Sequence, residues 1–187
     1  MTLRHWIEAD LDRLWARVHD SVLGVVPADR WTEHADDGGS SLAFLVWHVA
    51  RHHDLAVNAV VRGTPQVLEQ FGELSRLGDP PLGLAEQEPA ELAERLDPVE
   101  LVAYFDTVGE ATRRWLADVD LAVLAGVPDA SAALGRAGVP EAELGWLHGM
   151  WADQPASFFV QWEAVGHGIN HLGEMVSIRN RMGLSPF

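Results

Sequence analysis

Cysteine is absent from this 187-residue sequence, and so is lysine, because all 13 basic residues are arginines. The lack of cysteine excludes disulfides, thiolate metal sites and a cysteine nucleophile, which leaves imidazole and carboxylate groups as the good ligands for a transition metal. The arginines are scattered among 28 aspartates and glutamates, and the formal net charge is −15. Such a surface repels phosphate backbones and anionic lipids. We therefore expect no nucleic-acid partner and no membrane partner.

Long hydrophobic runs are also absent. No segment approaches the roughly 18 consecutive apolar residues of a membrane span. The N-terminal Met1–Trp6 is amphipathic and does not show the charged head followed by an apolar run that is typical of a signal peptide. These features predict a cytoplasmic protein. A chain of this length can bury a substantial core without covalent support, so we expect a single domain over residues 1–187.

Helical periodicity is what the sequence does contain, in four stretches at about 3–25, 41–62, 97–119 and 155–182. The third stretch opens with a helix-start pattern, in which Asp97 caps the helix, Pro98 follows at its first position and Glu100 completes a capping box. Two connections rich in proline and glycine, 64–96 and 120–154, are long enough to be functional or protective. The pattern predicts an all-α four-helix bundle with long connections.

Two pairs of histidines interrupt the apolar stripes, His48 with His52 and His167 with His171. Residues four positions apart lie one turn apart on the same helix face, so both imidazoles of a pair can reach one metal ion. In the zinc-protease motif with this spacing, a glutamate follows the first histidine and acts as the general base. Gly168 occupies that position after His167, which excludes peptidase chemistry of this type. Hydrogen-bonded core histidines are the alternative, although each neutral imidazole then needs partners for both nitrogens. The spacing alone leaves both interpretations open.

Other polar residues near these pairs have less defined roles. His53 lies about 100° around its helix from His52 and is expected at the surface or a rim. His148 falls in the second long connection, where a core or rim position is favoured over a substrate contact. Three carboxylates lie close to the histidine pairs in sequence, and each either accepts a hydrogen bond from an imidazole or belongs to a solvated helix face: Asp54, Glu163 and Glu174.

Two runs of residues resemble the DinB-like protein family. Residues 41–54, SLAFLVWHVARHHD, followed by Asn58 and by RGTPQVL at 62–68, are similar to the second helix and the loop after it. Residues 166–174, GHGINHLGE, are similar to the H-x-x-x-H motif of the last helix. The resemblance covers nearly the whole chain. It implies a four-helix bundle of up-down-down-up topology, with a metal ion held by three histidines, one from the second helix and two from the last.

The resemblance implies His48, His167 and His171 as the metal ligands. The cofactor would be a divalent metal ion, with zinc or nickel ahead of the other metals that suit imidazole. His52 occupies a position where many relatives have a residue other than histidine. It is a candidate fourth ligand, an alternative ligand or a catalytic base near an open position, so the coordination number stays open.

Relatives with known activity resemble thiol transferases and isomerases that use bacillithiol, mycothiol or glutathione. A metal with three histidine ligands keeps open positions that suit a thiolate. The resemblance therefore implies a metal-dependent thiol S-transferase or related enzyme, whose partners are a small-molecule thiol and an electrophile. Arginine-only cation usage and richness in alanine, glycine and leucine are associated with a high-GC bacterial genome, which makes mycothiol the first thiol to test.

Two other functions are compatible with the same residues. One is a non-catalytic metal-binding stress-response protein, and the other is a metal-dependent hydrolase, for which no well-placed general base is evident beyond His52. Fold-level analogy does not decide among the three. An exposed apolar helix face could also support a homodimer.

Overall fold

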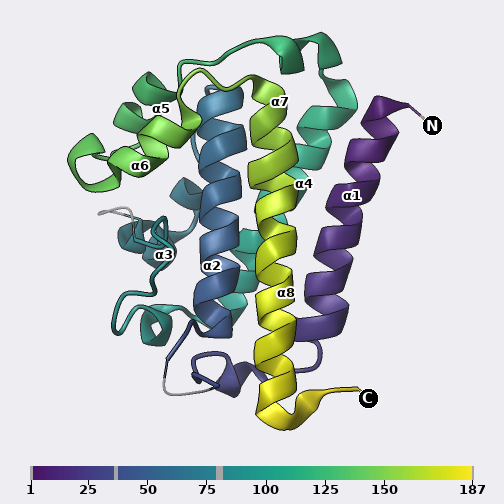
Figure 1. Cartoon of the computed structure of the whole chain (residues 1–187), viewed down its shortest axis with the longest axis vertical. Helices are drawn as coiled ribbons and strands as arrows, with labels where there is room; N and C mark the ends of the chain where they lie inside the picture. Colours follow the sequence, from purple (N-terminus) through teal and green to yellow (C-terminus); the bar gives the residue numbers. More distant parts are fainter. Residues whose placement is uncertain (1, 36–37, 79–81, 187) are drawn as a thin grey trace.

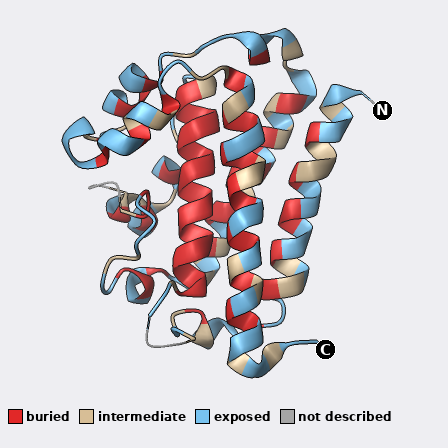
Figure 2. Ribbon diagram, in the orientation of Figure 1, coloured by how far each residue is buried: buried red, intermediate tan, exposed pale blue. Residues whose placement is uncertain are grey.

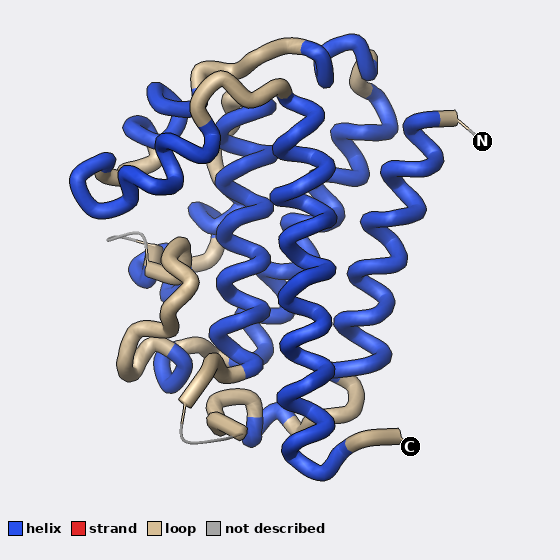
Figure 3. The backbone as a smooth tube through the Cα atoms, in the orientation of Figure 1, coloured by secondary structure: helices blue, strands red, loops and turns tan. Residues whose placement is uncertain are grey.

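The computed structural model describes residues 2–35, 38–78 and 82–186, and all regular structure within these ranges is helical (Figure 3). Four long helical stretches stand side by side (Figure 1), which confirms the predicted all-α class. None of the helices in the described ranges is both long and apolar enough to cross a lipid bilayer. The label η marks turns that are wound more tightly or more widely than an α-helix. The first stretch is α1 (Leu3–Val18) with η1 (His19–Leu23), the second is α2 (Leu42–His53) with η3 (Asp54–Val61), and the third is α4 (Pro98–Asp118). The fourth consists of the consecutive α7 (Ala156–Phe158), η7 (Phe159–Gly166), α8 (His167–Arg179) and η8 (Asn180–Leu184).

Side-chain caps begin α2 and α4. The Ser41 hydroxyl accepts a hydrogen bond from a backbone N–H of the first turn of α2 at 3.1 Å. The Asp97 carboxylate accepts from the N–H groups of Val99 and Glu100, and Pro98 occupies the first helical position, where its missing N–H has no consequence. The predicted start of the third helix is thereby confirmed. These local signals determine where the helices of the bundle start.

The packing order places α2 at the centre of the molecule. Both α1 and α2 pack against α4 and against α8, so α1 and α2 stand diagonally across the bundle. Figure 1 shows α1 and α8 running in one direction and α2 and α4 in the opposite one, which is the up-down-down-up topology. Every residue of α2 is buried (Figure 2), because the two long connections cover the face that the other helices leave open. All the histidines of α2 are therefore buried.

The connections contain short helices. Before α2 lies η2 (Ala28–Arg30), the connection to α4 carries η4 (Val67–Gln70), α3 (Gly72–Leu77) and η5 (Ala93–Arg95), and the connection to α7 carries η6 (Leu121–Ala125), α5 (Ala130–Arg136) and α6 (Glu141–Trp151). The buried Asp54 carboxylate accepts hydrogen bonds from the backbone N–H groups of Val67 and Leu68 and from the Tyr104 hydroxyl. Asp54 therefore anchors the first connection to the bundle, a role that neither expectation for this residue anticipated.

Candidate metal centre

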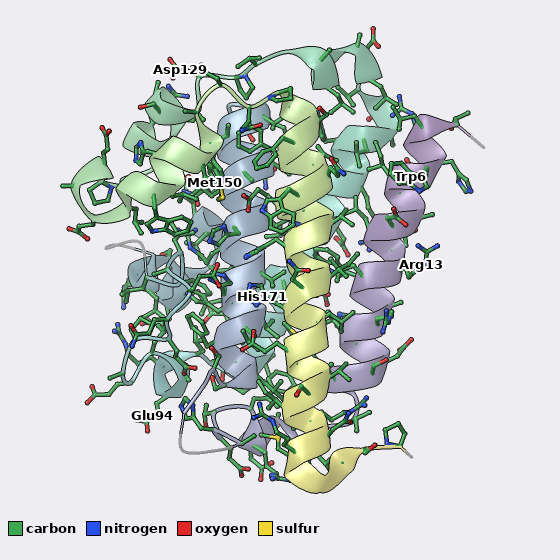
Figure 4. All side chains as sticks on the ribbon, viewed as in Figure 1. Trp6, Arg13, Glu94, Asp129, Met150 and His171 are labelled. Atoms are coloured by element: carbon green, nitrogen blue, oxygen red, sulfur yellow. The ribbon has the colours of Figure 1, made fainter. Side chains whose placement is uncertain are left out.

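The structure brings His48, His167 and His171 together between α2 and α8. The Nε2 atom of His167 lies 3.2 Å from Nε2 of His48 and 3.0 Å from Nε2 of His171. All three side chains are buried, and Figure 4 labels His171 where α8 faces α2. The helices position them by simple periodicity, since His167 and His171 are one turn apart and His48 faces them from the neighbouring helix. The three ring nitrogens converge on one point in the bundle.

The outer nitrogens of two of these imidazoles have partners that determine their tautomers. His48 Nδ1 donates to the Gly83 carbonyl oxygen at 2.7 Å, and His171 Nδ1 lies 3.1 Å from a carboxylate oxygen of Glu174. Because a carbonyl and a carboxylate only accept hydrogen bonds, each Nδ1 must carry the proton, and each neutral ring then turns an Nε2 lone pair toward the centre. Burial, followed by the neighbouring histidines, lowers the pKa of His167 and of His171, which favours the neutral rings.

Three neutral imidazoles in this arrangement cannot all find hydrogen-bond partners in one another. The only proton available among the three Nε2 atoms is that of His167, and it can be donated well to just one of the two facing lone pairs. The Nδ1 atom of His167 is buried without a hydrogen-bond partner among the described residues. A divalent cation accepts all three lone pairs at once, and imidazole nitrogen is a good ligand for zinc and nickel. This donor set fits a divalent metal better than the hydrogen-bonded core left open by the spacing.

His52 lies beside this cluster, with both ring nitrogens facing other partners. Its Nε2 donates to the Leu84 carbonyl oxygen at 2.9 Å, and its Nδ1 lies 3.1 Å from Oε2 of Glu163. The other Glu163 oxygen accepts from the indole N–H of Trp151 at 2.6 Å. One proton must therefore lie between His52 and Glu163. Burial raises the pKa of Glu163 to about 7 and lowers that of His52 to about 3, so below about pH 7 the proton is placed on the carboxyl and both groups are neutral.

Glu86 is a candidate site residue that the sequence reasoning missed. Its carboxylate oxygens lie 3.8 Å from Nε2 of His48 and 3.8 Å from Nε2 of His171. The ligand atoms of Glu86 and the three histidines all lie within 4.8 Å of one another, as do those of His52, Glu163 and His167. Glu86 belongs to a connection without helical periodicity, where the only signal was the length of the connection itself.

Residues 82–86, here called the strap, hold Glu86 beside α2. Three α2 side chains donate to successive carbonyl oxygens of the strap, Trp47 to Leu82 at 3.1 Å, His48 to Gly83 and His52 to Leu84. Gly83 has a φ of +84°, and a Cβ there would collide with the Trp47 indole. Glycine is therefore required where the strap crosses Trp47, and the strap orients the site histidines through its backbone.

The remaining expectations have mixed outcomes. The surface or rim position expected for His53 is wrong, because the side chain packs inside the bundle against α4 and α1. Its ring is fully buried, 2.8 Å from the Thr112 hydroxyl and with its centroid 5.3 Å from that of the Trp15 ring. His148 lies on α6, within the second connection, and is half-buried, with its Nε2 3.1 Å from the Val139 carbonyl oxygen. Glu174 is the acceptor for His171, whereas Glu163 pairs with His52 on α2.

Comparisons with known proteins agree with this architecture. A family profile described as the DinB superfamily matches residues 10–175, a span that contains all three converging histidines. A solved structure, described as the crystal structure of the conserved protein of locus from Enterococcus faecalis, has a TM-score of 0.64 at 16% sequence identity, with 98% of this chain and 99% of that chain covered. At that identity the likeness concerns the fold alone. Comparison with curated protein sequences finds no significant match.

Proposed function

The chain belongs to the DinB superfamily, and from this premise we propose that it binds one divalent metal ion through the Nε2 atoms of His48, His167 and His171. The observation that carries the proposal is the convergence of three Nε2 atoms, with those of His48 and His171 lying 3.2 and 3.0 Å from that of His167 and with the outer nitrogens of His48 and His171 already engaged. Such outer hydrogen bonds commonly orient ligand imidazoles in metal sites. Zinc and nickel are the first ions to test.

We further propose that the centre serves a thiol S-transferase, with mycothiol as the first thiol to test. A divalent ion held there would lower the pKa of a bound thiol and so favour its thiolate form. In the proposed reaction the thiol sulfur forms a bond to the electrophilic carbon, the leaving group departs with its bonding electrons, and the thiol proton passes to solvent. The histidines hold the ion on two packed helices, which keeps the reacting groups in a defined position.

Two half-exposed tryptophans beside the centre support a catalytic role. The Trp146 ring centroid lies 6.4 Å from that of His52, and the Trp162 ring centroid lies 6.4 Å from that of His167. Partly exposed aromatic rings next to a buried polar cluster offer apolar surface to an organic substrate.

The non-catalytic metal-binding protein remains the second candidate, because Glu86 approaches the histidine cluster and could complete a protein-only coordination sphere. A hydrolase has less support. His52, the residue suited to act as its base, has both ring nitrogens engaged by Leu84 and Glu163.

Metal analysis of single variants tests the ligand assignment. His48→Ala, His167→Ala and His171→Ala should each reduce bound zinc or nickel sharply and to a similar extent, because each removes one of three ligands. His148→Ala is the control, since this half-buried histidine of α6 contacts the backbone carbonyl of Val139, outside the metal centre, and its loss should leave metal content unchanged. Stoichiometric metal in any of the three variants would contradict the assignment, and loss of metal in His52→Ala would indicate a fourth histidine ligand.

A conjugation assay tests the activity separately. Metal-loaded protein is incubated with monochlorobimane and with mycothiol, bacillithiol or glutathione, and fluorescence is compared with that of the metal-free protein. We expect metal-dependent conjugation with at least one thiol, and mycothiol first. Stoichiometric metal without conjugation above the metal-free background, for all three thiols, would favour the non-catalytic candidate.

A further inference from the structure

Glu86 reaches from the strap toward the three-histidine cluster. Its two carboxylate oxygens each lie 3.8 Å from a different Nε2 atom, those of His48 and His171. These are the nitrogens that turn lone pairs inward, because their Nδ1 atoms donate to Gly83 and Glu174. A carboxylate oxygen and an imidazole lone pair that face each other repel. A metal cation among these atoms would attract both, so the arrangement suits a bound cation.

Glu86 is held less firmly than the histidines. The histidines are buried on long bundle helices, whereas the Glu86 side chain is 68% exposed and belongs to a connection. It also lines a surface cavity of about 380 Å³, together with neighbours that include His34, Ser40 and Glu88. A side chain that lies between a buried centre and a surface cavity can turn outward without disturbing the core.

We propose that Glu86 is a displaceable fourth ligand of the metal centre. The carboxylate occupies the remaining position when no small molecule is bound and yields it to an incoming ligand, while the strap stays attached to α2 through its backbone. This inference rests on the proposed function, because it requires an ion at the three histidines. It accounts for a centre that is closed by protein at rest and still accessible to a thiol.

The test uses the full chain loaded with Co²⁺ or Zn²⁺ and takes imidazole as a neutral probe ligand. Glu86→Gln keeps the size of the side chain, removes a good ligand, and lies at the surface where the fold tolerates substitution. The dissociation constant for Zn²⁺, measured by chelator competition, should rise at least about tenfold. Imidazole binding to the Co²⁺ protein, followed by visible absorption, should become several-fold tighter because the carboxylate no longer competes.

Glu94→Gln is the matched control. It removes the same charge from an exposed position on η5, in the same connection as Glu86 but outside the metal centre, so imidazole affinity should stay at the wild-type value. If Glu86→Gln leaves imidazole affinity unchanged, or if Glu94→Gln raises it equally, Glu86 acts only as a nearby charge and the inference is overturned. Wild-type protein that binds no metal would overturn the proposed function, and that result is known before any variant is compared.

Discussion

Replacing Glu163 by glutamine tests how the proton is placed in the buried pair with His52. His52 Nε2 donates to the Leu84 carbonyl, and one Glu163 oxygen accepts from the Trp151 indole. If His52 is neutral, a glutamine keeps every hydrogen bond, because its amide N–H donates to His52 Nδ1 and its carbonyl accepts from Trp151. If His52 is an imidazolium, a glutamine in either orientation leaves one N–H facing another. The substitution therefore separates a neutral pair from an ion pair.

The magnitude follows from the pKa of the carboxyl group. Burial raises the pKa of Glu163 from 4.5 to about 7, so the folded protein holds this proton more tightly than the unfolded chain does. Its contribution to stability is complete below pH 4.5 and is lost as the pH rises through 7. A gap of about 2.5 pH units, at about 1.4 kcal/mol each, corresponds to about 3.5 kcal/mol. Because glutamine does not titrate, Glu163→Gln should match wild type at acidic pH and exceed its stability by up to about 3.5 kcal/mol at pH 8.

Urea unfolding of metal-free protein at pH 5 and pH 8 measures this difference. Chelation of metal is required, because a bound ion adds its own concentration-dependent stability. Removing one partner of a buried ion pair typically lowers the free energy of unfolding by about 3 to 5 kcal/mol. A loss of that size at both pH values would refute the neutral arrangement and show that His52 is charged.

Three further predictions concern the strap, the core and the surface. Gly83→Ala should weaken metal binding, measured by chelator competition, and lower the free energy of unfolding by about 1 to 3 kcal/mol in urea, because a Cβ collides with Trp47. Gly145→Ala, in open space on α6, should leave metal binding unchanged and raise the free energy of unfolding by up to about 1 kcal/mol, because alanine is the better helix former. Burial lowers the pKa of His53 from 6.5 to about 3, so its stabilising contribution is present above pH 6.5 and is lost as the pH falls toward 3. His53→Gln should therefore flatten the pH dependence of the unfolding free energy between pH 6.5 and pH 3 by about 1.4 kcal/mol per pH unit, and an unchanged slope would contradict this account. The net charge of −15 predicts no DNA complex near physiological salt, and a salt-dependent gel shift at micromolar protein would disprove it.

Local features of the sequence were sufficient to predict the bundle. Apolar spacing of threes and fours is a property of each helix alone, and caps such as Asp97 act within one turn, so both are visible in a short window. The spacing of His167 and His171 likewise places both rings on one helix face without knowledge of any other helix. The choice of His48 as their partner rested on the family resemblance, and the packing of α2 against α8 brings its ring to them.

Contacts between distant parts of the chain decided the rest of the site. His48 meets His167 across 119 positions and the strap across 35, so neither contact leaves a trace in local periodicity. The same holds for Glu86, which approaches the histidines only because the strap folds back over α2. Composition and periodicity determined that this chain forms a helical bundle with histidines on its inner faces. Only the tertiary structure decided which imidazole nitrogens are free, because that depends on the backbone carbonyls and carboxylates that the connections and neighbouring turns place around each ring.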